Sequence, residues 1–506
     1  MKTKRRLCAE LLETRLVPTV WYLHPGGDLQ ATIDHSVNSG DSIYLDAGAT
    51  FTGPITLRAK TSGITIATNS FPLSQGVRVS PSDASSMAKI LAPSFYAAVQ
   101  TEPGASGYIL RGLEILPVSS SATVDTLVTL GDGSSNQTIG TILPNNITID
   151  QCFIHGYDEQ TIKRGIGLND GQSSVTNSYI SNFKSASQDT QAIAGWNGSG
   201  PYLIQNNYLE AAGENVIFGG GYSWIQQVPS GITVTNNTIS KPLFWDPYRH
   251  PHDHTTWSVK NLLELKNADT VLIANNTFQN NWVQSQAGTA ILLTPRGAQS
   301  GGSWVTVSNV TISHNTLNGT AQGIEILGSD DMSPGSKVTT NIKIQNNLFG
   351  DVASGNPLWG SASPPKVFLF APGVNGGPSN VIIDHNTILQ NAGGLLYLGG
   401  TVTGFQFTYN IVPQGEYGVI GSGLLGTAAL DAFCPGYVFS NNVIVFSGAV
   451  NVTYPPGTAE LANNNWSAVF GSGYQQSKYD DPGTYVAIGA YSGDGSNIVS
   501  FSTPLF

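Results

Sequence analysis

The sequence predicts an all-β protein, a single-stranded right-handed parallel β-helix, or solenoid, with a short N-terminal capping helix. Three observations predict it. A motif that ends in an asparagine doublet recurs along the chain, apolar residues alternate with period two inside the motif, and the spacing between copies varies. The composition agrees: charged residues are only 11% of the chain and Gly reaches 58 residues, so Asn, Ser, Thr and Gly must cover much of the surface.

The repeated motif is a short strand followed by Asn-Asn or His-Asn. Clear copies are YLIQNNYLE at 202–210, ITVTNNTIS at 232–240, VLIANNTFQ at 271–279, VTISHNTLN at 310–318, IKIQNNLFG at 342–350, VIIDHNTIL at 381–389 and YVFSNNVIV at 437–445. A strand of this length cannot bury its apolar face alone, so coil must stack on coil. The unequal spacing then means a constant strand core with loops of variable length.

The doublets predict a stack of asparagines at one corner of the solenoid. Asn tolerates the left-handed backbone conformation, and its amide can hydrogen-bond the coil above. We expect contiguous parallel coils from about 105 to 465, with these second residues in line: Asn207, Asn237, Asn276, Asn315, Asn347 and Asn386.

A second strand of each coil is expected beyond the doublet, for example in ENVIFGG at 214–220, LLELKN at 262–267 and AILLTPR at 290–296. The segment 28–37 predicts an amphipathic helix behind an Asp28 N-cap, which would cover the open apolar end of the first coil. The segment 81–93 is expected to be a loop with one helical turn.

The domain organisation predicted from these patterns has three parts. Residues 1–20 form a basic leader, 21–466 the β-helix, and 467–506 a Gly- and Ser-rich capping or tail segment. The start resembles a short LExRxVP-type leader of bacterial envelope and extracellular proteins, in Leu12, Glu13, Arg15, Val17 and Pro18. It implies an extracellular or cell-envelope location.

Charge, apolar runs and cysteine usage limit the function further. The net charge of -11 disfavours nucleic acid or an anionic membrane surface as partner, and no apolar run reaches the ~20 residues of a membrane span. An anionic ligand would therefore need a locally basic site. Cys8, Cys152 and Cys434 are too scattered for a disulfide framework and are expected to be small buried residues. We expect a monomer.

Over roughly residues 21–465 the pattern resembles the pectin-lyase-like superfamily of right-handed parallel β-helices. The stretch from NNYLEAAGENVIFGG through NLLELKNADTVLIANNTFQNNW to AILLTPRG is similar to a group of bacterial β-helix proteins of mostly uncharacterised function, with a looser likeness to alginate and chondroitin lyases. In those lyases a Lys on one coil and an Arg on a following coil are the catalytic base and acid. Lys266 and Arg296 match them in order.

The residues themselves support a site at this strand. If Leu263 and Leu265 point inward, Glu264 points outward beside Lys266. Elimination from a uronate needs a base for the proton next to the carboxylate, and positive charge or a metal ion to stabilise the resulting anion. The alternative is that Glu264 and Lys266 form an ordinary surface ion pair.

Calcium is the cofactor that the resemblance suggests, but this sequence departs from the pattern. The lyases carry carboxylates five and seven residues before the Lys, where this chain has Asn261 and Val259. Substitute oxygen ligands are Glu210, Glu214 and Asn215, one coil earlier, together with Glu264.

Two further groups are candidates for binding an acidic polysaccharide. The insertion 241–257 is rich in His and aromatic residues and is expected to overhang the groove. Its Trp245, Tyr248 and Trp257 would stack on sugar rings, with His254 beside them, while His250, His252 and His254 only loosely resemble a metal cluster. Lys163, Arg164 and Gln191, with Lys184, would extend a basic patch toward a carboxylated chain.

Three functions remain open at this stage. The first is β-elimination by a polysaccharide lyase, the second non-catalytic glycan binding or an envelope role, and the third a glycoside hydrolase or epimerase. The Asp330–Asp331 doublet alone does not make the clustered carboxylates of a polygalacturonase-like hydrolase. The IDH sequence at 383–385 resembles a pectate lyase signature but occupies the asparagine register, so we interpret it as structural.

Overall fold

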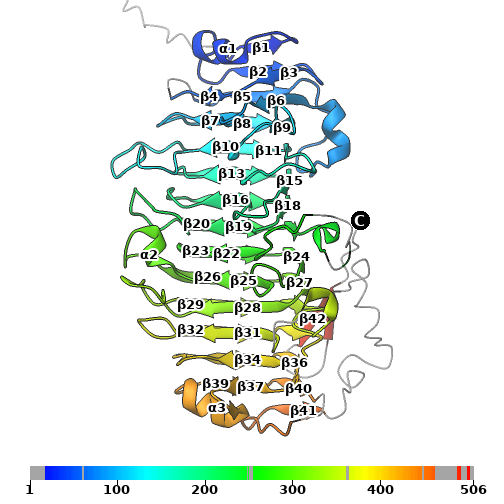
Figure 1. Cartoon of the computed structure of the whole chain (residues 1–506), viewed down its shortest axis with the longest axis vertical. Coiled ribbons are helices and arrows are strands. Elements are labelled where there is room, and N and C mark those ends of the chain that lie inside the picture. Colours follow the sequence, from blue (N-terminus) through cyan, green and yellow to red (C-terminus); the bar gives the residue numbers. More distant parts are fainter. Residues whose placement is uncertain are drawn as a thin grey trace, which may run out of the picture.

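The chain winds into a long stack of parallel coils (Figure 1). The computed structural model describes residues 18–59, 62–247, 249, 255–360, 364–446, 450–461, 487–491 and 498–501. Strands that lie one coil apart pair in parallel, and three strands per coil generate three sheets, called A, B and C below. The predicted right-handed parallel β-helix is confirmed, and each coil runs from sheet A through sheet B to sheet C.

Within the described residues, sheet A contains the strands that precede the asparagine corner: β1 (Val20–Leu23), β2 (Ser42–Leu45), β5 (Thr65–Thr68), β8 (Ile109–Arg111), β11 (Ile147–Asp150), β14 (Ser173–Thr176), β17 (Tyr202–Gln205), β20 (Ser230–Thr235), β23 (Ala268–Ala274), β26 (Val307–Ser313), β29 (Thr340–Gln345), β32 (Ser379–Asp384), β35 (Gln406–Thr408) and β39 (Val438–Ser440).

Sheet B contains the strands that follow this corner: β3 (Thr50–Thr52), β6 (Ala88–Ala92), β9 (Leu113–Pro117), β12 (Phe153–His155), β15 (Tyr179–Phe183), β18 (Tyr208–Ala211), β21 (Thr238–Ser240), β24 (Thr277–Asn281), β27 (Thr316–Thr320), β30 (Leu348–Phe349), β33 (Thr387–Ile388), β36 (Ile411–Pro413), β40 (Val443–Val445) and β41 (Ala459–Leu461).

Sheet C contains the last strand of each coil: β4 (Ile55–Leu57), β7 (Val99–Thr101), β10 (Thr126–Leu130), β13 (Arg164–Leu168), β16 (Gln191–Gly195), β19 (Glu214–Phe218), β22 (Leu263–Leu265), β25 (Thr289–Leu293), β28 (Gln322–Leu327), β31 (Lys366–Ala371), β34 (Gly394–Leu398), β37 (Gly418–Gly421) and β38 (Leu424–Leu425). β38 is antiparallel to β37, and β42 (Ala487–Tyr491) and β43 (Ile498–Phe501) form a separate antiparallel pair.

The helices are short and lie at coil ends and in loops: α1 (Leu29–His35), α2 (Gly297–Ser300), α3 (Gly426–Phe433), and the 3₁₀ turns η1 (Pro81–Ser86), η2 (Leu243–Trp245) and η3 (Pro357–Trp359). None of the helices in the described part of the chain has the length and apolar character needed to cross a bilayer.

Apolar side chains fill the inside of the coils in register. In sheet C one buried row runs through paired residues of successive strands, namely Ile193, Val216, Leu263, Ile291, Ile324, Phe368 and Leu396. One continuous core cluster extends from Leu23 to Tyr454, so each coil buries its apolar face only through its neighbours. Cys152 and Cys434 are buried in this core as free thiols, as predicted, whereas Cys8 lies outside the described residues.

At the corner between sheets A and B the two residues of each doublet have different roles. The first residue adopts the left-handed conformation, with φ of 55° at Asn206 and 57° at His314. The second donates its amide to the coils on both sides: Asn207 Nδ2 donates to Asn237 Oδ1 of the next coil at 3.0 Å and to the carbonyl of Val175 in the preceding coil at 2.8 Å. The same bonds link successive residues onward through Asn276, Asn315, Asn347, Asn386, Asn410 and Asn442.

Helices cover both ends of the core. α1 forms as predicted: Asp28 accepts the N–H of Ala31 at 2.8 Å, and Leu29 and Ile33 are buried against the first coils. At the other end α3 buries Ala429 and Leu430 (Figure 1). The sequence did not predict α3, and the segment 467–506 that it predicted as cap or tail lies outside the described residues apart from β42 and β43. In the segment 81–93 the expected helical turn is η1, but the residues after it form β6 of sheet B instead of a loop.

Candidate active site on sheet C

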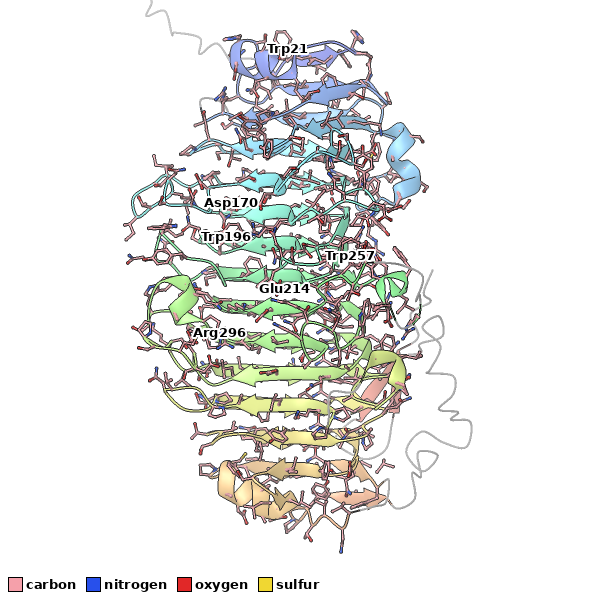
Figure 2. All side chains as sticks on the ribbon, viewed as in Figure 1. Trp21, Asp170, Trp196, Glu214, Trp257 and Arg296 are labelled. Atoms are coloured by element: carbon pink, nitrogen blue, oxygen red, sulfur yellow. The ribbon has the colours of Figure 1, made fainter. Side chains whose placement is uncertain are left out.

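The outer face of sheet C carries charged side chains that are nearly buried, in the middle coils of the stack. One outward row pairs Arg164 with Gln191 and Gln191 with Glu214. A second outward row contains Glu264, paired with Leu292, which in turn pairs with Glu325. Figure 2 shows Trp196, Glu214 and Arg296 at successive levels of this face.

Lys266 and Arg296 lie on adjacent coils at the same edge of sheet C. The backbone N–H of Arg296 donates to the carbonyl of Lys266 at 3.0 Å, and each residue follows the end of its strand. The Lys266 side chain is 14% exposed and its Nζ lies 3.7 Å from Glu264 Oε1. The Arg296 side chain is 23% exposed, and its Nη1 contacts Asp330 Oδ1 at 3.3 Å and the carboxylate of Asp331. The two predicted catalytic residues are therefore brought together.

Glu264 lies beside Lys266 and is hydrogen-bonded to neighbouring residues of this edge. It is 3% exposed and accepts hydrogen bonds from Thr294 Oγ1 at 2.8 Å and from Asn261 Nδ2 at 3.2 Å. Direct substrate binding, as predicted for Glu264, does not fit this burial. Nor is the pair with Lys266 the exposed ion pair of the alternative interpretation, because the two side chains are only 4% and 14% exposed.

Glu214 lies one coil earlier and is fully buried. Gln191 Nε2 donates to its Oε2 at 2.9 Å, and Lys260 Nζ lies 3.6 Å from its Oε1 and 2.6 Å from Asp189 Oδ2. Burial raises the pKa of Glu214, and the neighbouring Glu264 raises it further. Gln191 is also buried, so it orders Glu214 and does not face a substrate, contrary to its predicted role.

Lys163 and Arg164 lie two coils before Glu214, because Arg164 pairs with Gln191 and Gln191 with Glu214. Arg164 Nη1 lies 3.2 Å from Asp125 Oδ2, and its guanidinium carbon lies 4.5 Å from the centre of the Trp196 ring. Lys163 Nζ is 4.0 Å from Asp125 Oδ1, with a third of its side chain exposed. Both cations remain candidates for contact with an anionic chain.

The three substitute calcium ligands do not converge. Asn215 turns its Oδ1 into the corner between sheets B and C, where it accepts from Lys241 Nζ at 2.8 Å. Glu210 instead accepts from the N–H of Asn182 and from Tyr208 Oη, and burial raises its pKa to about 7. Within the described residues no group of three His, Cys, Asp or Glu side chains could hold a metal ion. The side chains of Glu210, Glu214 and Asn215 thus have separate partners and are not brought together, and calcium binding stays a prediction.

The aromatic residues predicted to stack on sugar are buried. Trp245 and Trp257 are 2% and 6% exposed and pack with Ala212, Val259 and Trp282. Lys184 Nζ lies 5.3 Å and 5.5 Å from the centres of the two rings, so Lys184 belongs to this cluster and not to a surface patch. The cluster anchors the insertion to the solenoid. Tyr248, His250, His252 and His254 lie outside the described residues.

Sequence reasoning missed Lys260 and Trp196. Lys260 has a raised pKa because the carboxylates of Glu214 and Asp189 outweigh the effect of burial, which lowers it. No motif marks Lys260, since its partners come from two earlier coils. Trp196 directly follows the strand 191–195 of sheet C. An aromatic residue at the end of a predicted strand could have indicated this position from the sequence.

Comparison with known proteins establishes the fold. No family model and no curated protein sequence matches the chain. Among solved structures, the catalytic unit of a thermostable GH87 α-1,3-glucanase from Streptomyces thermodiastaticus superposes with a TM-score of 0.51 at 12% identity, covering 86% of this chain and 66% of that one. The present chain thus spans just under two thirds of the glucanase unit.

Two lyases match with lower scores. A mannuronic-acid-specific polysaccharide family 6 lyase from the human gut microbiota has a TM-score of 0.49 at 13% identity, covering 89% of this chain and 93% of that one. An alginate lyase from a Paenibacillus species has a TM-score of 0.36 at 13% identity, covering 88% and 98%. At these identities the likeness extends to the fold alone.

Proposed function

We propose that this protein cleaves an acidic polysaccharide by β-elimination at the sheet C edge that holds Lys266 and Arg296. One observation carries the proposal: two partly exposed cations lie on adjacent coils, and each is paired with a buried carboxylate, Glu264 or Asp330. Such pairing holds flexible cationic side chains in one orientation, which a reacting group requires.

In the proposed reaction Lys266 first gives its ammonium proton to solvent, and the resulting amine takes the proton from the carbon next to the uronate carboxylate. The electron pair of that bond forms a double bond to the neighbouring ring carbon, and the bond from that carbon to the glycosidic oxygen breaks. The leaving oxygen takes a proton from the ammonium of Lys266. Arg296 donates hydrogen bonds to the uronate carboxylate and so stabilises the anion that develops.

The carboxylates have supporting roles in this scheme. Glu264, 3.7 Å from Lys266 Nζ, stabilises the ammonium that forms when the proton is taken. Asp330 has a lowered pKa because the N–H groups of Ala298 and Met332 and the Arg296 guanidinium outweigh the effect of burial, which raises it. Asp330 is therefore ionised and holds Nη1 of Arg296, while the planar guanidinium has further donors for a substrate carboxylate.

The substrate class follows from the local charge. The chain carries a net charge of -11, yet Lys266 and Arg296 lie together beyond the ends of β22 and β25, and Lys163 and Arg164 lie at the start of β13 of the same sheet. Each of these cations has a carboxylate beside it, so we expect the cations to bind individual carboxylates of a polyanion. An acidic polysaccharide is the matching partner, and the leader-like N-terminus is consistent with action outside the cell.

Hydrolysis by Glu214 and Glu264 is the second candidate. Burial and the neighbouring Glu264 raise the pKa of Glu214, and a carboxyl group with a raised pKa is what a hydrolase uses as its general acid. Burial weighs against it: the two residues are 0% and 3% exposed, and a general acid must reach the glycosidic oxygen.

The nature of the product decides between these functions. The protein is incubated with alginate, polygalacturonate and chondroitin sulfate, while the ultraviolet absorbance of unsaturated uronates and the number of new reducing ends are followed. Elimination predicts that both rise together and that a variant with Lys343→Ala, an exposed lysine on sheet A, behaves as wild type. Reducing ends without absorbance would support hydrolysis, and binding without either product would contradict an enzymatic role.

A further inference from the structure

An exposed aromatic pair lies on the loop 219–226, which follows β19 of sheet C. Tyr222 is 44% exposed and Trp224 38% exposed, and their ring centres are 4.4 Å apart at an angle of 47°. Large aromatic side chains that remain in water as a pair are candidates for a binding surface. Neither residue is needed for the core of the solenoid.

The loop is held firmly although its rings are exposed. Residues between and beside the rings are buried: Ser223 is 0% exposed and Ile225 is 4% exposed. The N–H of Ser223 donates to the carbonyl of Ser300 at 3.1 Å, and the N–H of Ile225 donates to Asn197 Oδ1 at 3.0 Å. Alternate residues therefore anchor the loop to two other coils, and the rings are presented outward in a fixed position, which lowers the entropy lost on binding.

The same loop lies directly against the proposed catalytic edge. A Cβ added at Gly220 would lie 2.9 Å from Lys266 Cδ, and one at Gly221 would lie 2.8 Å from Trp196 Cδ1. A Cβ added at Gly301 would lie 3.1 Å from the Tyr222 ring, and Gly301 ends the helix α2 that begins after Arg296. The glycines thus let the loop approach Lys266 closely and place the aromatic pair beside both catalytic coils.

We propose that Tyr222 and Trp224 form a stacking subsite for a pyranose ring of the polysaccharide, next to the ring that reacts at Lys266. The inference rests on the proposed function for its substrate class. A pyranose presents C–H bonds on its faces, which pack against the negative face of an aromatic ring. The cations at the edge bind carboxylates, and the aromatic pair binds the ring itself, so together they favour a carboxylated sugar chain over a simple polyanion.

Binding and turnover are measured separately to test this subsite. Native gels containing alginate, polygalacturonate or chondroitin sulfate report binding by the retardation of the protein. We expect the double variant Tyr222→Ala/Trp224→Ala to lose about tenfold in affinity for the polysaccharide that retards wild type. Its Tm should be unchanged, and in turnover its KM should rise while kcat is kept. Tyr22→Ala is the matched control, because Tyr22 is 57% exposed and stacks on Tyr44 on sheet A.

The outcomes separate this inference from the proposed function. Retardation of wild type and of Lys266→Ala, lost in the double variant, supports the subsite even if no product is ever formed. Equal retardation of wild type and the double variant overturns the subsite even if elimination occurs. A wild-type protein that none of the three gels retards also overturns it.

Discussion

The corner between sheets A and B and the edge between sheets C and A belong to the same coils but are built in opposite ways. At the A–B corner the same side chain makes the same bonds in successive coils from Asn207 to Asn410, as Asn237, Asn276 and Asn315 do. At the C–A edge each coil differs: only residues 266–267 separate β22 from β23, whereas 294–306 separate β25 from β26. The repeated asparagines hold the coils together, whereas the loops of unequal length at the C–A edge place different side chains on each coil.

Stability and activity are expected to depend on different parts of the same coils. The asparagine corner satisfies backbone groups that would otherwise be buried without partners, so its contribution is to folding. The partly exposed cations at the C–A edge contribute little to the core, so their contribution is to chemistry. Substitutions at the two places should therefore separate unfolding free energy from turnover.

The third corner, between sheets B and C, should show the largest effect on stability. Lys241 is fully buried, and its Nζ donates to the carbonyls of Ala211 and Gly213, to Asn215 Oδ1 and to the carbonyl of Asn261. Lys241→Met leaves these acceptors buried without a donor, and we expect a loss of ~2–4 kcal/mol in the free energy of unfolding. Urea denaturation measures it, with Lys343→Met as the exposed control. Equal stability of the two variants would show that the ammonium is dispensable.

A single substitution in the asparagine stack should have the next largest effect. Asn276→Leu removes the amide that donates to the carbonyl of Val234 and to Asn315 Oδ1, and we expect a cost of ~1–3 kcal/mol. Thermal and urea unfolding should both report it, while turnover at the C–A edge stays within about twofold of wild type. Asn136→Leu, in an exposed loop, provides the control. A neutral Asn276→Leu would refute the structural role of the stack.

The pH dependence of stability should reflect Asp170, which follows β13 and is fully buried. Burial raises its pKa to about 8 from the ordinary 3.8. Between these values the folded protein keeps a proton that the unfolded chain has lost, so stability falls as pH rises through this window, by at most ~1.4 kcal/mol per pH unit. Asp170→Asn should remove this slope in urea titrations at several pH values. An unchanged slope in the variant would assign it to other groups.

The smallest effect is expected at Lys163. Its Nζ is 4.0 Å from a largely exposed Asp125, so Lys163→Ala should change the free energy of unfolding by less than about 0.5 kcal/mol. Retention on an acidic polysaccharide column should nevertheless weaken, and the difference from wild type should shrink as salt is added. Retention equal to wild type at low salt would remove Lys163 from the binding surface.

The sequence predicts the repeated parts of the molecule and only half of the site. Period-two alternation and the Asn doublets predict the coils, and the Asp28 cap predicts α1, because these signals are local or recur. Lys266 and Arg296 were predicted from the resemblance to alginate and chondroitin lyases, in which a Lys and an Arg lie on successive coils. The burial of Trp245, the partners of Asn215 and the position of Lys260 could not be predicted, since they depend on how loops from different coils fold over one another. The helix α3 was not predicted because its N-cap residue, Leu425, makes no side-chain hydrogen bond that would mark the start of a helix.

The most direct test of the account compares turnover and melting temperature in Lys266→Ala. Because this partly exposed lysine is outside the core, the Tm of the variant should remain within about 2 °C of wild type. Formation of unsaturated uronate should fall by at least ~10²-fold, the contribution expected of a general base. Retained turnover in this variant, or a loss of activity that merely follows a large fall in Tm, would contradict the claim that the C–A edge is the catalytic site.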